Sequence, residues 1–161
     1  MTTFRWVAGD RPEGMAIRQV YAFCFETGGR VLLREDDGDY SLPGGSPEPG
    51  EDARMTLDRE CLEESQVMLG DVSYLGYQEV TGDGREPFAQ LRYAALITGF
   101  LPRRPDPDTG RTYRRLLTPI SRAPALLDWG VEGLLQAADA ARAAIRLGVD
   151  PASALGDDWR D

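Results

Sequence analysis

The chain contains no histidine, and it has only two cysteines among its 161 residues. The absence of histidine excludes zinc sites built on imidazole, Ser-His triads and Cys-His dyads. For Cys24 and Cys61, we predict two buried, reduced thiols rather than a disulfide, because disulfides belong to oxidising compartments. Any catalysis must therefore rest on carboxylates, on basic side chains, on tyrosine or on a metal ion.

Positive charge and long apolar segments are also scarce. The formal net charge is -9, which argues against long nucleic acids as partners, because binding their backbones requires clustered Lys and Arg. No stretch approaches the roughly 20 apolar residues of a membrane span, and the first residues lack the pattern of a secretory signal. We therefore expect a cytoplasmic protein that does not bind membranes. An acidic protein can still bind phosphates where a metal ion supplies the positive charge.

The length and the hydrophobic patterning predict one mixed α/β domain spanning residues 1–161. Alternating or β-branched segments predict strands at 17–25, 31–34, 74–80, 88–100 and 114–120. Apolar residues at three-to-four spacing predict helices at 51–65 and 131–147. Strands, helix, strands and helix in this order favour a sheet covered by helices on both faces. Two loops rich in Pro, at 43–50 and 101–110, separate these elements.

The helix predicted at 51–65 carries three carboxylates, Glu60, Glu63 and Glu64. Their spacing of i, i+3 and i+4 places them on one face, about 5 to 6 Å apart at the Cβ atoms. Such a face can be merely solvated. It becomes a good ligand set when a divalent cation binds, since Mg²⁺ prefers several oxygen ligands and binds alongside phosphates.

Residues around the start of the helix support the interpretation that the three glutamates bind a divalent cation. Arg59 can reach back to Glu51 and fix the orientation of the carboxylates, although an ordinary surface ion pair is the alternative. Gly44 and Gly45 let the backbone approach a ligand closely, or they simply form a turn. The combination at fixed spacing is far more specific than any one of these features.

Residues 45–67 read GSPEPGEDARMTLDRECLEESQV, and this segment resembles the Nudix box. That family pattern is Gly, five residues, Glu, seven residues, Arg-Glu, an aliphatic residue, any residue, Glu-Glu, any residue, Gly and an aliphatic residue. The matching positions are Gly45, Glu51, Arg59, Glu60, Glu63, Glu64 and Val67. Two positions differ: Cys61 replaces an aliphatic residue, and Gln66 replaces the usual Gly. A residue other than Gly with positive φ at position 66 would be strained by about 1 kcal/mol.

The resemblance implies a Nudix-type α/β/α sandwich with a mixed β-sheet, and Mg²⁺ or Mn²⁺ as the cofactor. It implies hydrolysis of a nucleoside diphosphate linked to another moiety, through attack by metal-activated water. The metal ligands would be Glu60, Glu63, Glu64 and the Gly44 carbonyl, with Glu51 and Arg59 as a supporting ion pair. The substrate could be ADP-ribose, a nucleotide sugar, a dinucleoside polyphosphate or a damaged nucleoside triphosphate.

A helix carboxylate or a loop acid outside the motif would accept the proton of the attacking water. Asp106 and Asp108, in the loop at 101–110, are the favoured loop candidates, and solvated loop acids are the alternative. Three acids near the turn between the strands predicted at 74–80 and 88–100 are further candidates: Glu79, Asp83 and Glu86.

Arginines are the candidates for binding the substrate phosphates, because the guanidinium offers a planar fork of donors. They are Arg92, Arg111, Arg114 and Arg115. Surface ion pairs are the competing interpretation for each. A nucleotide base could stack on Tyr40, Phe88 or Trp129, unless these aromatic residues belong to the core.

Two other functions stay open at this point. A Nudix-fold module could bind a nucleotide ligand as a sensor without hydrolysing it, although three intact glutamates argue against this. A purely structural acidic helix is the third interpretation, and it predicts only weak metal binding. The Ala-rich helix at 131–147 is a candidate interface for a homodimer.

Overall fold

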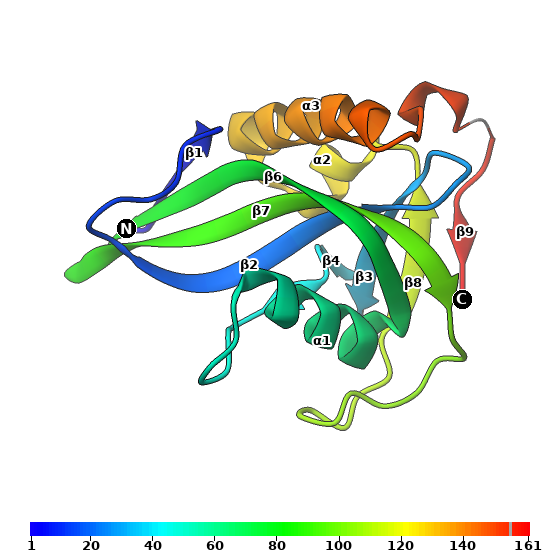
Figure 1. Ribbon diagram of the computed structural model, residues 1–161, viewed down its shortest axis with the longest axis horizontal. Helices are drawn as coiled ribbons and strands as arrows, with labels where there is room; N and C mark the ends of the chain where they lie inside the picture. The colour runs from blue at the N-terminus through cyan, green and yellow to red at the C-terminus, as the bar shows by residue number, and fades with distance from the viewer. Residues whose placement is uncertain (155) are drawn as a thin grey trace.

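A nine-stranded mixed sheet with helices on both faces forms the computed structural model, which describes residues 1–154 and 156–161 (Figure 1). The strands are β1 (Thr3–Ala8), β2 (Ala16–Phe25), β3 (Val31–Asp36), β4 (Asp39–Ser41), β5 (Gly44–Gly45), β6 (Val67–Gly82), β7 (Arg85–Phe100), β8 (Arg114–Thr118) and β9 (Trp159–Arg160). The helices are α1 (Ala53–Ser65), α2 (Ala123–Leu127), α3 (Gly130–Arg146) and the short 3-10 helix η1 (Pro151–Ser153).

The strand order is β1-β6-β7-β2-β3-β8-β9, with β4 paired to β3 and β5 paired to β2. Strands β2 and β7 run parallel, with Val20 opposite Leu91, and the other described pairings are antiparallel. The pairing of β5 places Gly44 opposite Tyr21 in the centre of the sheet. This pairing brings the segment before α1 against the middle of β2.

Two hydrophobic clusters lie on opposite faces of the sheet, as the alternation of side chains along β2 requires. Val20, Ala22 and Cys24 pack on the α1 side with Leu57 and Cys61. Phe23 and Phe25 pack on the other side, where the buried alanines of α3 cover them. Figure 1 shows α1 on one face and α2 with α3 on the other. The predicted α/β/α sandwich with a mixed sheet is confirmed.

Most predicted elements occur, with shifted ends. The helix predicted at 51–65 begins at Ala53, because Asp52 is its N-cap and accepts a hydrogen bond from the Met55 N–H. The strand predicted at 74–80 lies in the C-terminal half of β6, and the helix predicted at 131–147 is α3. The strands predicted at 17–25 and 31–34 are β2 and β3, which pair antiparallel.

The sequence patterns did not reveal β1, α2 and β9. Strand β1 is largely exposed, so its residues carry no clear apolar alternation. Helix α2 has five residues and β9 has two, which is too short for a periodic signal. None of the helices in the described part of the chain is long and apolar enough to cross a membrane.

Cys24 on β2 and Cys61 on α1 are free thiols with no exposed surface. The prediction of two buried, reduced cysteines is therefore confirmed. Cys61 takes the position of an aliphatic residue as a small apolar side chain in the core between α1 and the sheet.

Candidate active site

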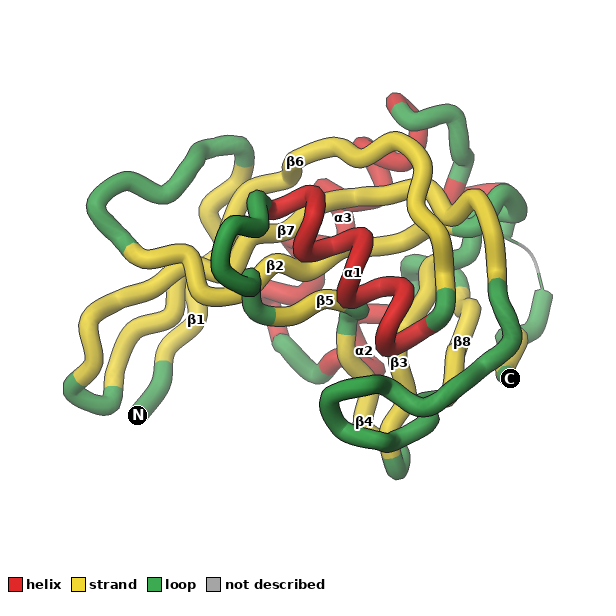
Figure 2. The backbone as a smooth tube through the Cα atoms, turned by 60° about the horizontal axis from the view of Figure 1, so that its bottom comes forward, coloured by secondary structure: helices red, strands yellow, loops and turns green. Residues whose placement is uncertain are grey.

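Helix α1 presents Glu60, Glu63 and Glu64 toward β5 and the loop that follows β7. The helix ends at Gln66, which takes the left-handed conformation with φ 50° and ψ 43°. Loop 101–113, which joins β7 to β8, lies beside this end of the helix (Figure 2). The C-terminal half of α1 therefore meets two segments that are distant in the sequence.

Glu64 is the most deeply buried of the three glutamates, with 5% of its surface exposed. Its Oε1 accepts a hydrogen bond from the Gly44 N–H at 3.0 Å, and its Oε2 pairs with Arg34. Burial raises the pKa of Glu64 to about 7, although the nearby Arg34 charge acts in the opposite direction. Glu64 thus connects α1 to the Gly44–Gly45 segment and to β3.

Gly45 leaves room for the carboxylate of Glu60. A Cβ atom at position 45 would lie 2.5 Å from Glu60 Oε1, so any larger residue would displace this carboxylate. At Gly44, where φ is +144°, a Cβ atom would lie 2.2 Å from the Val20 carbonyl oxygen. Gly44 is therefore needed for the close approach of β5 to β2, and Gly45 leaves the Glu60 carboxylate in its place.

Arg59 holds the acidic side chains together. Its Nε and Nη2 donate to the two oxygens of Glu51, at 2.7 and 3.0 Å. Its Nη1 donates to Glu60 at 2.9 Å and to Glu63 at 3.2 Å. The bidentate bond from Arg59 lowers the pKa of Glu51 to about 2. The expected ion pair is present, and Arg59 also contacts two of the three helix glutamates.

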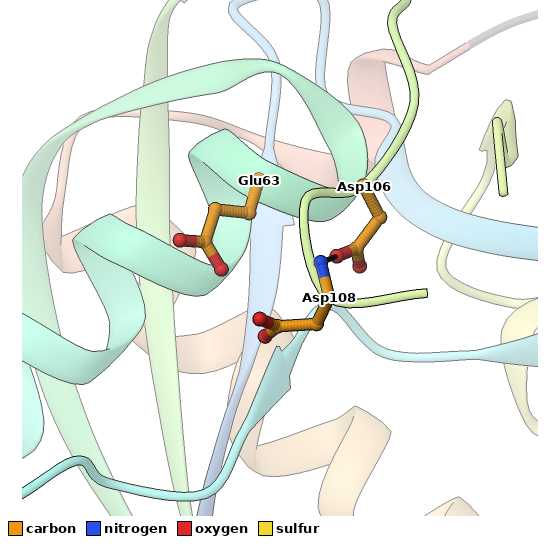
Figure 3. Close-up of side chains that lie close together, drawn as sticks. All are labelled: Glu63, Asp106 and Asp108. Atoms are coloured by element: carbon orange, nitrogen blue, oxygen red, sulfur yellow. Dashed lines mark hydrogen bonds between the residues drawn. The ribbon is translucent and has the colours of Figure 1, made fainter. Parts of the chain in front are cut away.

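Carboxylate oxygens of Glu63, Asp106 and Asp108 all lie within 4.8 Å of one another (Figure 3). Asp106 is buried and accepts a hydrogen bond from the Asp108 N–H at 2.7 Å, which fixes the turn of loop 101–113. Asp108 is exposed. The fold therefore brings both favoured loop acids to the acidic face of α1.

The other three candidate acids lie elsewhere. Glu79 on β6 pairs with Arg5 of β1 at 2.9 Å. Asp83 pairs with the N-terminal ammonium at 3.0 Å, and Glu86 lines a pocket beside it. These residues belong to the β6–β7 hairpin end, which Figure 1 shows far from loop 101–113.

The chemistry of this cluster suits a divalent ion. Burial raises the pKa of both Glu60 and Glu63, and further carboxylates nearby raise it more. A cation would relieve this repulsion, and carboxylate oxygens are the ligands that Mg²⁺ and Mn²⁺ prefer. The cluster of Glu63, Asp106 and Asp108 can therefore hold a metal ion.

The arginines proposed for phosphate binding occupy different environments. Arg111 is half exposed and pairs with Asp36 and Asp37, at 2.5 and 2.9 Å. Arg114 is exposed on β8, whereas Arg115 is buried and paired to Asp161 at 2.6 Å. Arg92 lies on the α3 face of the sheet and is almost fully buried.

Arg34 contacts Glu64, although no sequence pattern indicated it as a residue of the site. Its guanidinium also lies over the ring of Tyr113, 4.4 Å from the centroid. The only available signal was its place at the end of the strand predicted at 31–34. Nothing in the sequence shows that this end of the strand lies beside α1.

The family comparison is decisive on membership, because the NUDIX domain model matches residues 15–129. The chain belongs to the NUDIX family. No curated protein matched the sequence.

Solved structures of Nudix proteins resemble this chain. A pyrophosphohydrolase of Bacillus subtilis, BsRppH, is 28% identical over 63% of this chain and has a TM-score of 0.56. The match spans 63% of the length of that protein. A NUDIX hydrolase from Nitrosomonas europaea is 21% identical, with a TM-score of 0.62 over 88% of this chain and 97% of its own. MutT from Bacillus halodurans is 17% identical, with a TM-score of 0.56 over 74% and 78%. The similarity to the last two structures shows that the fold is shared.

Proposed function

We propose that this Nudix protein is a pyrophosphohydrolase that cleaves a nucleoside diphosphate linked to another group and requires Mg²⁺ or Mn²⁺. The observation that carries the proposal is the convergence of Glu63 with Asp106 and Asp108, within 4.8 Å, on the acidic face of α1. Similarity to the pyrophosphohydrolase BsRppH supports the same reaction class.

Glu60, Glu63, Glu64 and the Gly44 carbonyl are the proposed metal ligands, and Asp106 and Asp108 lie close to Glu63. When bound, a divalent ion supplies Lewis acidity and neutralises phosphate charge. Arg59 keeps Glu60 and Glu63 in place through its bonds to both, and Glu51 holds Arg59 in turn. Positioning of this kind matters because misplaced ligands lose much of the rate.

Glu63 and Asp108 are the better placed groups for accepting the proton of the attacking water. The carboxylate of Asp106 is engaged by the Asp108 N–H and is buried. Asp108 is exposed, and Glu63 is accessible at 23% of its side chain. A general base needs direct access to the reacting water, so Asp106 is better suited to holding Asp108 in position. For Arg111 and Arg114, a role in phosphate binding stays a prediction.

The cytoplasmic location and the homodimer also stay predictions. The outer face of α3 supports the latter, because it exposes four large apolar side chains: Val131, Leu134, Leu135 and Ile145. Sedimentation of wild type and of Leu134→Glu would test it, since a charge at a dimer contact should give monomers.

The reaction is tested by measuring phosphate release from nucleoside diphosphate derivatives with Mg²⁺ or Mn²⁺, in wild type and in Glu63→Gln. We expect turnover that needs the metal and is lost in Glu63→Gln. Asp58→Asn is the matched control, because Asp58 lies on the same helix and pairs with Arg54 at the exposed surface. Nucleotide binding without turnover would instead support the sensor function.

A further inference from the structure

Arg92 carries a buried positive charge without a carboxylate partner among the described residues. It is 1% exposed, on the face of the sheet opposite α1. Its Nε donates to Gln136 at 2.9 Å, and its Nη2 donates to Gln90 at 3.3 Å. Neutral oxygens compensate a buried charge poorly, so burying such a residue lowers the stability of the fold unless a ligand also binds to it.

The residues around Arg92 form a ladder of amides across the sheet. Gln136 donates to Gln78 at 2.8 Å, Gln78 donates to Gln90 at 3.0 Å, and Gln90 donates to Gln19 at 3.1 Å. Arginine can only donate, so Gln136 and Gln90 must turn their oxygens toward it. This fixes the direction of every amide in the ladder, independently of how amide groups are assigned.

The direction of the ladder decides what remains free for a ligand. Each glutamine oxygen already accepts at least one hydrogen bond, and the Gln90 oxygen accepts two. Arg92 Nη1 also donates to the Leu91 carbonyl oxygen, at 3.4 Å. The second N–H of Gln78, that of Gln90 and the two remaining N–H groups of Arg92 have no partner among these bonds. The side chains of the ladder therefore offer mainly donors.

Gln78, Gln90 and Arg92 together line a pocket of about 220 Å³. Aromatic rings of Phe4, Tyr21 and Trp129 also line it. Arg92 lies 5.0 and 5.1 Å from the centroids of the Tyr21 and Trp129 rings. Asp128 lines an adjoining pocket of about 190 Å³, but not the pocket that Arg92 lines. Aromatic walls with polar groups at one side suit a flat ring that carries hydrogen-bond acceptors.

The pocket and the acidic site lie on opposite faces of the sheet, and the segment 41–45 connects them. Ser41 and Leu42 line it and directly precede the Pro43-Gly44-Gly45 segment. Tyr21 pairs with Gly44 across β2 and β5, and Glu64 is bonded to the Gly44 N–H. A nucleotide with its phosphates at the glutamates of α1 can thus extend past Gly44 toward the pocket.

We propose that this pocket receives the base of the substrate nucleotide, and that Arg92, Gln78 and Gln90 select a base with a ring carbonyl oxygen over one with an amino group. The proposal rests on the proposed function, whose substrate class it narrows to nucleotides of oxo bases. Paired donors on a carbonyl edge discriminate well between bases, whereas an amino group would place N–H against N–H.

The test compares bases that exchange this oxygen for an amino group, with the accompanying loss of the proton on the neighbouring ring nitrogen. The probes are IMP against AMP, and UMP against CMP, with affinities measured by calorimetry in the presence of Mg²⁺. We expect the oxo member to bind at least about tenfold more tightly in each pair that binds. Arg92→Gln and Gln78→Met should both reduce this ratio toward one. Arg142→Gln, an exposed arginine of α3, is the matched control and should leave it unchanged.

Three results would overturn the proposal: an amino member that binds as tightly as its oxo partner, failure of all four nucleotides to bind, or an unchanged ratio in a folded Arg92→Gln. The binding measurement is independent of hydrolysis. An oxo preference without turnover of any substrate would therefore remove only the proposed function. Turnover without a base preference would remove only the pocket assignment.

Discussion

The side-chain amide of Gln66 donates a hydrogen bond to the Glu63 carbonyl oxygen at 2.8 Å, and so caps the helix that carries the glutamates. Its Oε1 accepts a bond from the Arg104 N–H at 3.3 Å, and its backbone carbonyl accepts one from the Leu101 N–H at 2.8 Å. Gln66 takes the positive φ that favours glycine. Its bonds offset this strain and attach loop 101–113 to α1.

Replacing Gln66 with glycine should therefore change activity more than stability. Gln66→Gly relieves about 1 kcal/mol of strain but loses two side-chain hydrogen bonds worth about 1 kcal/mol each. We expect the free energy of unfolding to change by no more than about 1 kcal/mol, and kcat to fall by about threefold or more, because the loop with Asp106 and Asp108 loses an anchor. Urea unfolding and steady-state kinetics measure the two effects. A more stable protein with unchanged kcat would contradict the anchoring role.

The ion pair between Glu51 and Arg59 should make stability depend on pH. The pKa of Glu51 is about 2 in the folded protein, below its ordinary value of 4.5. A carboxylate whose pKa is lower in the folded than in the unfolded protein stabilises the fold at pH values above the unfolded pKa. This contribution is lost as the pH falls from 4.5 toward 2. We expect Glu51→Gln to be less stable than wild type at pH 7, with a difference that shrinks below pH 4.5.

Glu48→Gln is the matched control for this experiment. The carboxylate of Glu48 lies 3.7 Å from Arg59 but is 58% exposed, so its pair should contribute little. Denaturant titrations at pH 7 and at pH 3 give the comparison. The same stability difference for Glu51→Gln at both pH values would show that the pair does not contribute as its geometry indicates.

The spacing of the motif on α1 was sufficient to predict the local part of the site. Glu60, Glu63 and Glu64 share a face because helical geometry leaves no other choice, and Arg59 reaches Glu51 across the first turns of the helix. Contacts between distant segments could not be predicted in this way. The bond of Arg34 to Glu64 depends on how β3 lies against α1, and the sequence contains no local pattern for that.

Arg92 shows what the sequence pattern of a strand cannot predict. Apolar residues alternate from Leu91 onward, so the strand was predictable, but this alternation places Arg92 on the other face and does not show that this face is buried as well. Which side chains of β7 lie against α3 depends on the pairing of β7 with β2 and β6. The amide ladder joins residues from β2, β6, β7 and α3, which only the tertiary structure brings together.

The loop acids should contribute to metal binding. In Asp108→Asn, we expect the Mn²⁺ concentration for half-maximal activity to rise by at least about tenfold, since one charged oxygen near Glu63 is lost. The melting temperature without metal should stay close to that of wild type, because Asp108 is exposed. The stabilisation by added Mn²⁺, followed by thermal unfolding, should decrease in parallel.

Asp71→Asn provides the control for the loss of one acidic charge, because Asp71 is exposed on β6. Its Mn²⁺ response should match that of wild type. If Asp71→Asn and Asp108→Asn behaved alike, the effect would reflect net charge and not a site. Asp106→Ala separates a further role. The buried Asp106 side chain accepts the Asp108 N–H, so its removal should also lower stability.

The two cysteines should be unreactive in the native protein. The neighbouring Cys24 side chain and then burial raise the pKa of the Cys61 thiol, and neither residue has exposed surface. Thiol reagents attack the thiolate, so reaction requires an opening of the α1–sheet packing. We expect DTNB to label both thiols in guanidinium and to label the native protein at least about a hundredfold more slowly. Rapid labelling of one thiol in the native state would show that α1 detaches easily from the sheet, and the glutamates would then not be held in a fixed arrangement.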